Sequence, residues 1–247
     1  MNASAPWSVL SQSWLHIQLP GYRESPEHHT YEGSSLEDLP PIPIGLDEEC
    51  EWLMRHGAIY GHGALNEYER DIQPALVEKL ALGANIALPH SFRRFMSSPE
   101  LQSRVRSCTD CYLDPGERVL ETIDSIPGHL VHFLSDSQSC AHWYLHILPN
   151  GESAVLVSPD LYCYQIENSD WIENPSCRLE RIDLSGLDFA YCAPSFSSFL
   201  YRFWIENEIW FALEDSQRPL NALESDYVRH YAAKRSRSAA VIRDRVE

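Results

Sequence analysis

Two cysteines separated by two residues form the most enzyme-like string in the chain. Cys108-Thr109-Asp110-Cys111 has the spacing of a zinc-chelating pair and of a dithiol redox site. Structural zinc takes further ligands, usually from a second such pair, and the sequence contains no second pair. A thioredoxin-type pair follows a strand and opens a helix, whereas this pair follows a predicted helix over residues 99–106. We interpret both thiols as small buried side chains, with a thiol-dependent enzyme as the alternative.

Histidines alternate with apolar residues in two adjacent predicted strands. If residues 135–139 form the loop of an antiparallel hairpin, Leu134 faces Cys140. His132 then lies opposite His142, close enough for the two imidazoles to clamp a metal. The alternative is that these histidines belong to a polar sheet surface that faces solvent or a protein partner. We adopt this second interpretation and therefore predict no bound metal and no cofactor. Because side chains alternate along a strand, this face would carry His132, Cys140, His142, Tyr144 and His146.

The opposite face of the same hairpin is the predicted core side. It carries Val131, Phe133, Ala141, Trp143, Leu145 and Ile147. A matching apolar stripe lies on a helix that begins at Ser195, where Phe196, Phe199, Leu200, Phe203, Trp204 and Phe211 follow helical spacing. Such a stripe is typical of a helix face buried against a sheet.

Turn and cap signals divide the rest of the chain into short elements. We predict further helices over residues 47–55, 74–83, 99–106 and 225–237. We predict strands over residues 129–134, 140–148, 154–157 and 161–165, with an edge strand over 180–184. Strands joined by loops this short must pair antiparallel. The expected fold class is therefore α+β, with an antiparallel sheet of about 4–6 strands packed on one side by helices.

Three motifs occur in the order found in a known superfamily. Its early helix is matched by Leu88, Pro89, Phe92 and Phe95, its polar hairpin by residues 143–151, and its closing helix by Ala193, Ser195, Phe196, Phe199 and Leu200. Over residues 74–211 the chain resembles the SUKH superfamily, which contains bacterial toxin-immunity proteins and fungal cell-wall assembly regulators. Many members carry an Asn-Gly-Gly turn after the early helix, whereas here Ser98-Pro99-Glu100 starts another helix.

The resemblance implies a SUKH-like fold and a non-enzymatic protein-binding module. In one form the module is an immunity protein that occludes the active site of a basic toxin. The alternative is a solitary regulatory or scaffold protein similar to the fungal cell-wall regulators. A metal- or thiol-dependent enzyme is a further alternative, which would rest on the histidine face or on the cysteine pair.

Length and composition indicate one domain with extensions. With 247 residues, of which 44% are hydrophobic, the chain can bury a full core. We expect a Pro/Ser-rich arm over residues 1–46, a single domain over 47–233 and a basic tail over 234–247. Apolar anchors for the arm are Trp7, Leu10, Trp14 and Leu15. The chain has no apolar run of about 18 residues and no secretory-signal pattern, and its cysteines are scattered, so we expect a cytoplasmic protein with reduced thiols and no membrane contact.

The charge of the chain is strongly acidic outside its tail. The net charge is −17, and residues 1–233 alone carry 14 basic and 34 acidic residues, a balance of −20. An acidic body repels phosphate backbones, which argues against direct nucleic-acid binding. The same negative charge would attract a basic protein partner. The alternative interpretation is that the acidic charge only keeps the protein soluble. The expected contact residues are His132, His142, Tyr144 and His146 on the hairpin face, with Tyr144 as the aromatic anchor, and the acidic loop residues Asp136, Glu152 and Asp160.

Overall fold

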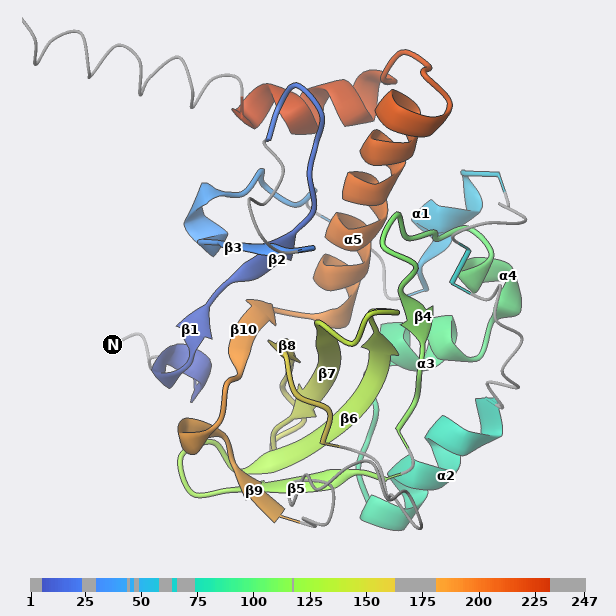
Figure 1. The fold of residues 1–247 in the computed structure, drawn as a ribbon. Helices are drawn as coiled ribbons and strands as arrows, with labels where there is room; N and C mark the ends of the chain where they lie inside the picture. Colours follow the sequence, from blue (N-terminus) through green and yellow to red (C-terminus); the bar gives the residue numbers. More distant parts are fainter. Residues whose placement is uncertain are drawn as a thin grey trace, which may run out of the picture.

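A curled eight-stranded mixed sheet is the centre of the molecule (Figure 1). The computed structural model describes residues 6–23, 30–43, 45–46, 49–57, 64–65, 74–116, 118–162 and 181–231. Within them the strand order is β1 (Ser11–Gln12), β10 (Ala190–Ala193), β8 (Ser153–Ser158), β7 (His142–Ile147), β6 (Gly128–Ser135), β5 (Leu120–Ile123) and β9 (Arg181–Asp183). A further strand, β4 (Tyr112–Leu113), pairs with β6, and β2 (Trp14–His16) forms a separate hairpin with β3 (Glu32–Ser34).

The α+β class is confirmed, but the predicted all-antiparallel sheet of four to six strands is wrong in its details. The two edge strands are parallel to their neighbours, β1 to β10 and β9 to β5. Each of these pairs is joined through a long stretch of chain, so the short-loop argument for antiparallel pairing does not apply to them. The central strands β5, β6, β7 and β8 do pair antiparallel, as short loops require.

Helices gather on one face of this sheet and beyond its end. The α-helices are α1 (Glu51–Met54), α2 (Pro74–Ala84), α3 (His90–Met96), α4 (Pro99–Gln102) and α5 (Phe196–Trp210), and α5 runs into the π-helix η5 (Phe211–Asp215). The 3-10 helices are η1 (Pro6–Val9), η2 (Leu36–Asp38) and η4 (Leu184–Gly186), and residues 222–231 form a last helix. The predicted basic tail, residues 234–247, lies outside the described residues.

Local capping explains where two of these helices begin. The hydroxyl of Ser195 accepts a hydrogen bond from the Ser198 amide at the start of α5. Ser98 caps α4 in the same way, and Pro99 occupies the first helical position, where a missing N–H costs nothing. The predicted start of both helices is confirmed, although α4 ends four residues earlier than expected.

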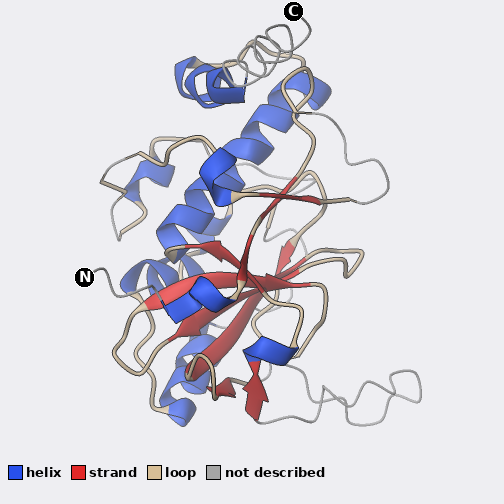
Figure 2. Cartoon of the chain, turned by 90° about the vertical axis from the view of Figure 1, so that its left-hand side faces the viewer, coloured by secondary structure: helices blue, strands red, loops and turns tan. Residues whose placement is uncertain are grey.

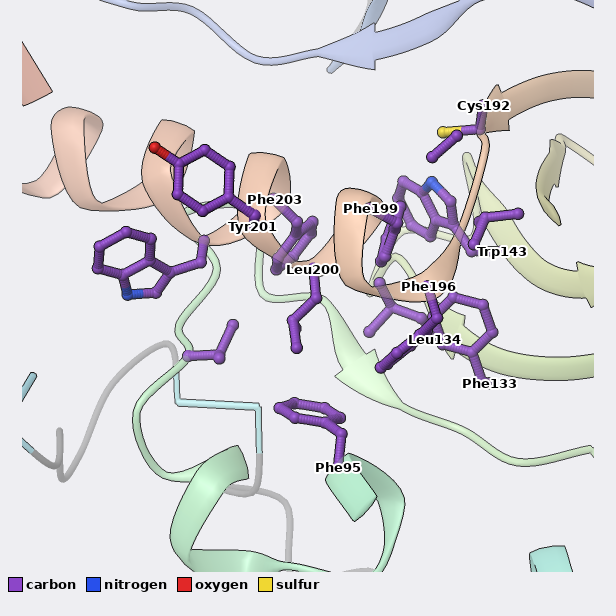
Figure 3. Close-up of a cluster of buried hydrophobic side chains, with 14 of the residues drawn as sticks. Phe95, Phe133, Leu134, Trp143, Cys192, Phe196, Phe199, Leu200, Tyr201 and Phe203 are labelled. Atoms are coloured by element: carbon purple, nitrogen blue, oxygen red, sulfur yellow. The ribbon is translucent and has the colours of Figure 1, made fainter. Parts of the chain in front are cut away.

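The main core lies between the sheet and helices α3 and α5. Phe196 packs against Phe133 with ring centroids 5.5 Å apart, and Phe199 lies 6.2 Å from Trp143 (Figure 3). The predicted stripe on α5 is confirmed, because Phe196, Phe199, Leu200, Phe203, Trp204 and Phe211 are all buried. The predicted core face of the hairpin is confirmed as well, since its six apolar residues belong to the same cluster.

A second core covers the other face of the sheet. Trp7 and Leu10 from the N-terminal segment pack there with Tyr162 and Phe189, over Leu130 and other inward-facing sheet residues. The sheet is therefore covered on both faces, with α3 and α5 on one face and with η1 and loops on the other. Every β6 and β7 side chain on this second face is consequently removed from solvent.

The N-terminal segment also packs along α5, which extends beyond the sheet toward the helix at residues 222–231 (Figures 1 and 2). Arg23 forms an ion pair of 2.7 Å with Glu206 of α5, and both side chains are buried. Glu206 also accepts hydrogen bonds from Trp14 at 3.0 Å and from Tyr227 at 2.8 Å. The boundary expected at residue 46 thus separates segments that pack on one another. None of the helices in the described ranges is long and apolar enough to cross a membrane.

Candidate functional site

The β6–β7 hairpin has a different register from the one expected. His132 lies opposite Tyr144, and Ser135 lies opposite His142, because the register shifts between His132 and Leu134. The predicted opposition of His132 to His142, with Leu134 facing Cys140, is therefore wrong. The physical reason is a β-bulge, which inserts one unpaired residue into β6 and which no alternation pattern reveals. The histidines still share a face, since the His132 and His142 rings are 5.7 Å apart.

This face is not a surface. His132, Tyr144 and His146 are 0% exposed and His142 is 2% exposed, so the expectation of an exposed interaction face is wrong. Alternation along a strand determines which side chains share a face but not what covers that face. Here the second core covers it. The Tyr144 hydroxyl donates to the Asp160 carbonyl at 2.8 Å and accepts from the Tyr162 amide at 3.1 Å. These two hydrogen bonds attach the segment at residues 160–162 to β7.

His146 is held as a neutral imidazole by two buried partners. The Trp7 indole N–H donates to its Nδ1 at 2.9 Å, and its Nε2 lies 2.8 Å from the Thr122 hydroxyl. Burial lowers the pKa of His146 to about 4. Burial, followed by the nearby His142, likewise lowers the pKa of His132 to about 3. At neutral pH both imidazoles are therefore uncharged and act as buried packing and hydrogen-bonding groups.

Around His142 a chain of polar groups leads from a buried carboxylate to the molecular surface. Ser135 donates to Asp114 Oδ2 at 3.3 Å, and the Ser135 hydroxyl lies 2.9 Å from His142 Nδ1. His142 Nε2 lies 3.0 Å from the hydroxyl of Ser139, which is exposed. Burial lowers the pKa of His142 below its usual range despite three neighbouring carboxylates, so the imidazole is neutral at pH 7.

Asp136 builds the turn that carries Ser139. One of its carboxylate oxygens accepts from the amides of Gln138 at 3.0 Å and Cys140 at 3.3 Å, and the other accepts from the Tyr31 hydroxyl at 2.9 Å. Asp136 is 1% exposed, so its carboxylate organises the turn and is not available to a partner. Of the acidic residues expected at the contact, Glu152 and Asp160 are exposed.

The two exposed acidic residues do not lie together. His142 pairs with Ser158, so Asp160 lies at the end of the sheet that carries the β6–β7 turn. Ile147 pairs with Ser153, which puts Glu152 at the opposite end, about 17 Å away along β7. The predicted site is thus divided between the two ends of the hairpin.

The thiols of Cys108 and Cys111 have raised pKa values, whereas a reactive thiol has a lowered one. Cys111 is buried against the Tyr31 hydroxyl, 3.2 Å from its sulfur, and burial raises its pKa to about 11. Burial, followed by the neighbouring Cys111, raises the pKa of Cys108 far above the ordinary range of a thiol. The five cysteines at positions 50, 108, 111, 140 and 192 are free thiols. Across the described ranges, no three His, Cys, Asp or Glu side chains come together in a way that suits a metal ion.

Sequence reasoning missed Asp114, Ser135 and Ser139 as partners of His142. Ser135 and Ser139 lie in the predicted loop over residues 135–139. No sequence signal joins Asp114 to them, because β4 and the loop after it reach β6 only through tertiary pairing. Comparisons of the chain with protein-family models, with curated proteins and with solved structures return no match. The likeness to the SUKH superfamily therefore rests on the residues quoted above.

Proposed function

We propose that this chain is a protein-binding module whose partner is a basic protein. The observation that carries the proposal is the composition of the described surface. Its exposed acidic side chains are Glu32, Glu37, Asp38, Glu49, Glu51, Glu100, Glu121, Asp124, Glu152, Asp160, Asp188, Glu214, Asp215 and Asp226. Its exposed basic side chains are Arg55, Lys79, Arg93, Arg94, Arg181 and Arg229.

Several of these basic side chains are already paired with acidic ones. Arg93 contacts Glu78, Arg181 contacts Glu121 and Arg229 contacts Asp226. The uncompensated surface charge is therefore negative, which favours encounter with a positively charged protein and repels nucleic acid.

The acidic residues best placed to meet a partner lie at one end of the sheet. Thr122 pairs with Gly128, and Ile147 pairs with both His129 and Ser153, so the β5–β6 and β7–β8 turns lie at the same end. Asp124 and Glu152 are exposed in these turns, about 10 Å apart if they follow the spacing of two strands. We call Asp124, Glu152 and the adjoining Asp183 at the end of β9 the acidic rim.

The resemblance to the SUKH superfamily narrows the partner to a class. Immunity proteins of that superfamily bind toxins, and toxins that act on nucleic acid are usually basic because their substrate is a polyanion. On this proposal the acidic rim attracts the toxin, and steric and electrostatic occlusion blocks the toxin's active site.

Affinity purification of the tagged full-length protein from its native cell, at low and moderate salt, tests the proposal. We expect mass spectrometry to identify a basic partner whose recovery falls as salt rises, because salt screens surface charges. The double variant Asp124→Lys/Glu152→Lys should lower the association rate constant with the purified partner by about 10-fold. The matched control Glu214→Lys/Asp215→Lys changes the net charge equally, at exposed positions beyond α5, and should have a smaller effect.

One result would reject the proposal, and another would reject the acidic rim as the contact. Recovery of no salt-sensitive basic protein would remove the partner class. Equal loss of association rate in the two double variants would show that net charge alone attracts the partner and that the acidic rim is not the contact.

A further inference from the structure

The polar groups around His142 follow the sequence found in nucleophilic serine sites, in which an orienting group precedes an imidazole base and the base precedes the serine. They run from Asp114 through Ser135 and His142 to Ser139, with separations of 3.3 Å, 2.9 Å and 3.0 Å. The three inner members are at most 8% exposed, whereas Ser139 is exposed. In a nucleophilic serine site a base takes the hydroxyl proton, and a third group orients the base.

The donors and acceptors along this chain are compatible with the order of protons that a nucleophilic serine requires. Ser135 donates a hydrogen bond to the Asp114 carboxylate, so its oxygen can accept from His142 Nδ1–H. His132 Nε2 lies 3.1 Å from the same oxygen, which has two lone pairs. With Nδ1 protonated, Nε2 of the neutral imidazole carries the lone pair. Nε2 therefore accepts from the Ser139 hydroxyl, which is the direction that general-base activation requires.

The turn presents Ser139 in a constrained conformation. Its φ is +58°, in the left-handed region that non-glycine residues adopt at a cost. The Ser139 amide donates to the Asp136 carbonyl at 2.9 Å, and the Asp136 side chain holds the amides on either side. The turn thus fixes the position of the hydroxyl while leaving it open to solvent.

We propose that Ser139 is a nucleophilic serine with His142 as its general base, and that it accepts small acyl or phosphoryl electrophiles. In acyl transfer from an ester, a bond forms between Ser139 Oγ and the carbonyl carbon, and the bond from that carbon to the leaving oxygen breaks. The Ser139 proton moves to His142 Nε2 and then to the leaving oxygen. Gln138 and Cys140, which flank Ser139, are small or polar and exposed, which suits a short acyl group. This site does not depend on the proposed partner binding.

Labelling of the full-length protein with a small fluorophosphonate tests the site. Ser139 Oγ attacks phosphorus, the P–F bond breaks, fluoride leaves, and His142 takes the proton. We expect peptide mapping to locate the adduct on Ser139, at a rate about 100-fold above that of the urea-unfolded chain, which is the effect of a positioned general base. Ser139→Ala should abolish the adduct. The matched control Ser137→Ala, an exposed serine of the same turn, should label like the unchanged protein.

The pH profile separates a positioning role of Ser135 from a structural one. The charged groups that face His142 are Asp114, Asp136 and Asp160, and His132 lies beside it. In Ser135→Ala, Nδ1–H loses its acceptor, the imidazolium is less stable, and half-maximal labelling moves to lower pH. If the substitution only loosened the site, water would reach His142, its pKa would rise, and half-maximal labelling would move to higher pH instead.

The proposal is overturned if folded protein labels no faster than unfolded protein, or if the adduct maps elsewhere. It is also overturned if Ser137→Ala reduces labelling as much as Ser139→Ala does. A thermal melt of each variant shows whether a loss of labelling reflects unfolding.

Discussion

At the scale of single residues, this protein buries many groups that sequence reasoning expects at the surface. Glu206 shows how such burial is compensated. Burial alone would raise the pKa of Glu206, but the Arg23 charge and hydrogen bonds from Arg23, Trp14 and Tyr227 outweigh it and hold that pKa below its usual range. A carboxylate with these partners stays ionised without water.

We predict that removing one partner of this ion pair is costly. Glu206→Ala leaves Arg23 buried and uncompensated, and should lower the free energy of unfolding by about 3–5 kcal/mol, measured by urea denaturation. The exposed pair Glu78–Arg93 is the control, and Glu78→Ala should cost less than about 1 kcal/mol. Similar costs for the two variants would mean that burial does not set the energy of the Glu206 pair.

The buried histidines predict that the fold is sensitive to acid. The unfolded chain binds these protons with a pKa near 6.5, whereas the folded pKa values are about 3 for His132 and about 4 for His146. The unfolded state therefore binds more protons below pH 6.5, and stability falls as pH decreases from there toward the folded values. Each histidine contributes a slope that approaches about 1.4 kcal/mol per pH unit.

Urea denaturation at pH values from 7.5 down to 4.5 measures this slope. His146→Gln removes one titrating group and should reduce the slope by about 1.4 kcal/mol per pH unit near its steepest part. An unchanged slope in this variant would contradict the assignment of His146 as a neutral ring in the folded state.

At the scale of elements, the close packing of β6 on β7 leaves no room for a side chain at one glycine. A Cβ placed on Gly128, the first residue of β6, would lie 2.3 Å from the Ile147 carbonyl oxygen and 3.0 Å from His146 Nε2. Backbone at this distance cannot move aside without distorting the pairing of the two strands. The absence of a side chain at this position is therefore a condition for the hairpin.

We predict opposite effects for two glycine-to-alanine variants. Gly128→Ala should destabilise the protein by about 1–3 kcal/mol, since overpacking forces the backbone to shift. Gly83→Ala lies in α2, where an added Cβ meets nothing within 4 Å, and should stabilise it by about 0.5–1 kcal/mol through helix propensity. Thermal unfolding measures both, and a neutral Gly128→Ala would contradict the close approach.

At the scale of the whole molecule, the N-terminal segment completes the fold. Trp7 and Leu10 belong to the second core, Trp14 belongs to the main core, and β1 extends one edge of the sheet. The expected apolar anchoring of this segment is confirmed for these three residues, and Leu15 is half-buried. The segment packs against both faces of the sheet.

We predict that Trp7→Ala lowers the free energy of unfolding by about 3–5 kcal/mol, because it empties part of the second core and leaves His146 without its indole donor. Val9 lies in the same 3-10 helix but is 64% exposed, so Val9→Ala should change it by less than about 0.5 kcal/mol. Urea denaturation distinguishes the two. Equal, small effects would indicate that the N-terminal segment is a separable arm.

The sequence by itself determined the local features of this protein. The cap at Ser98, the start of α5 at Ser195, the apolar stripe of α5 and the core face of the β6–β7 hairpin follow from propensity and periodicity, which act over a few neighbouring residues. The acidic charge is likewise a property of composition.

Only the tertiary structure decided what meets across long separations in the chain. The bulge after His132, the parallel edge strands β1 and β9, and the cover over Tyr144 and the histidines all depend on contacts between distant segments. Alternation along a strand leaves both faces open until another part of the chain packs on one of them. The same reason explains why Asp114, Ser135, His142 and Ser139 become a connected site only in the folded molecule.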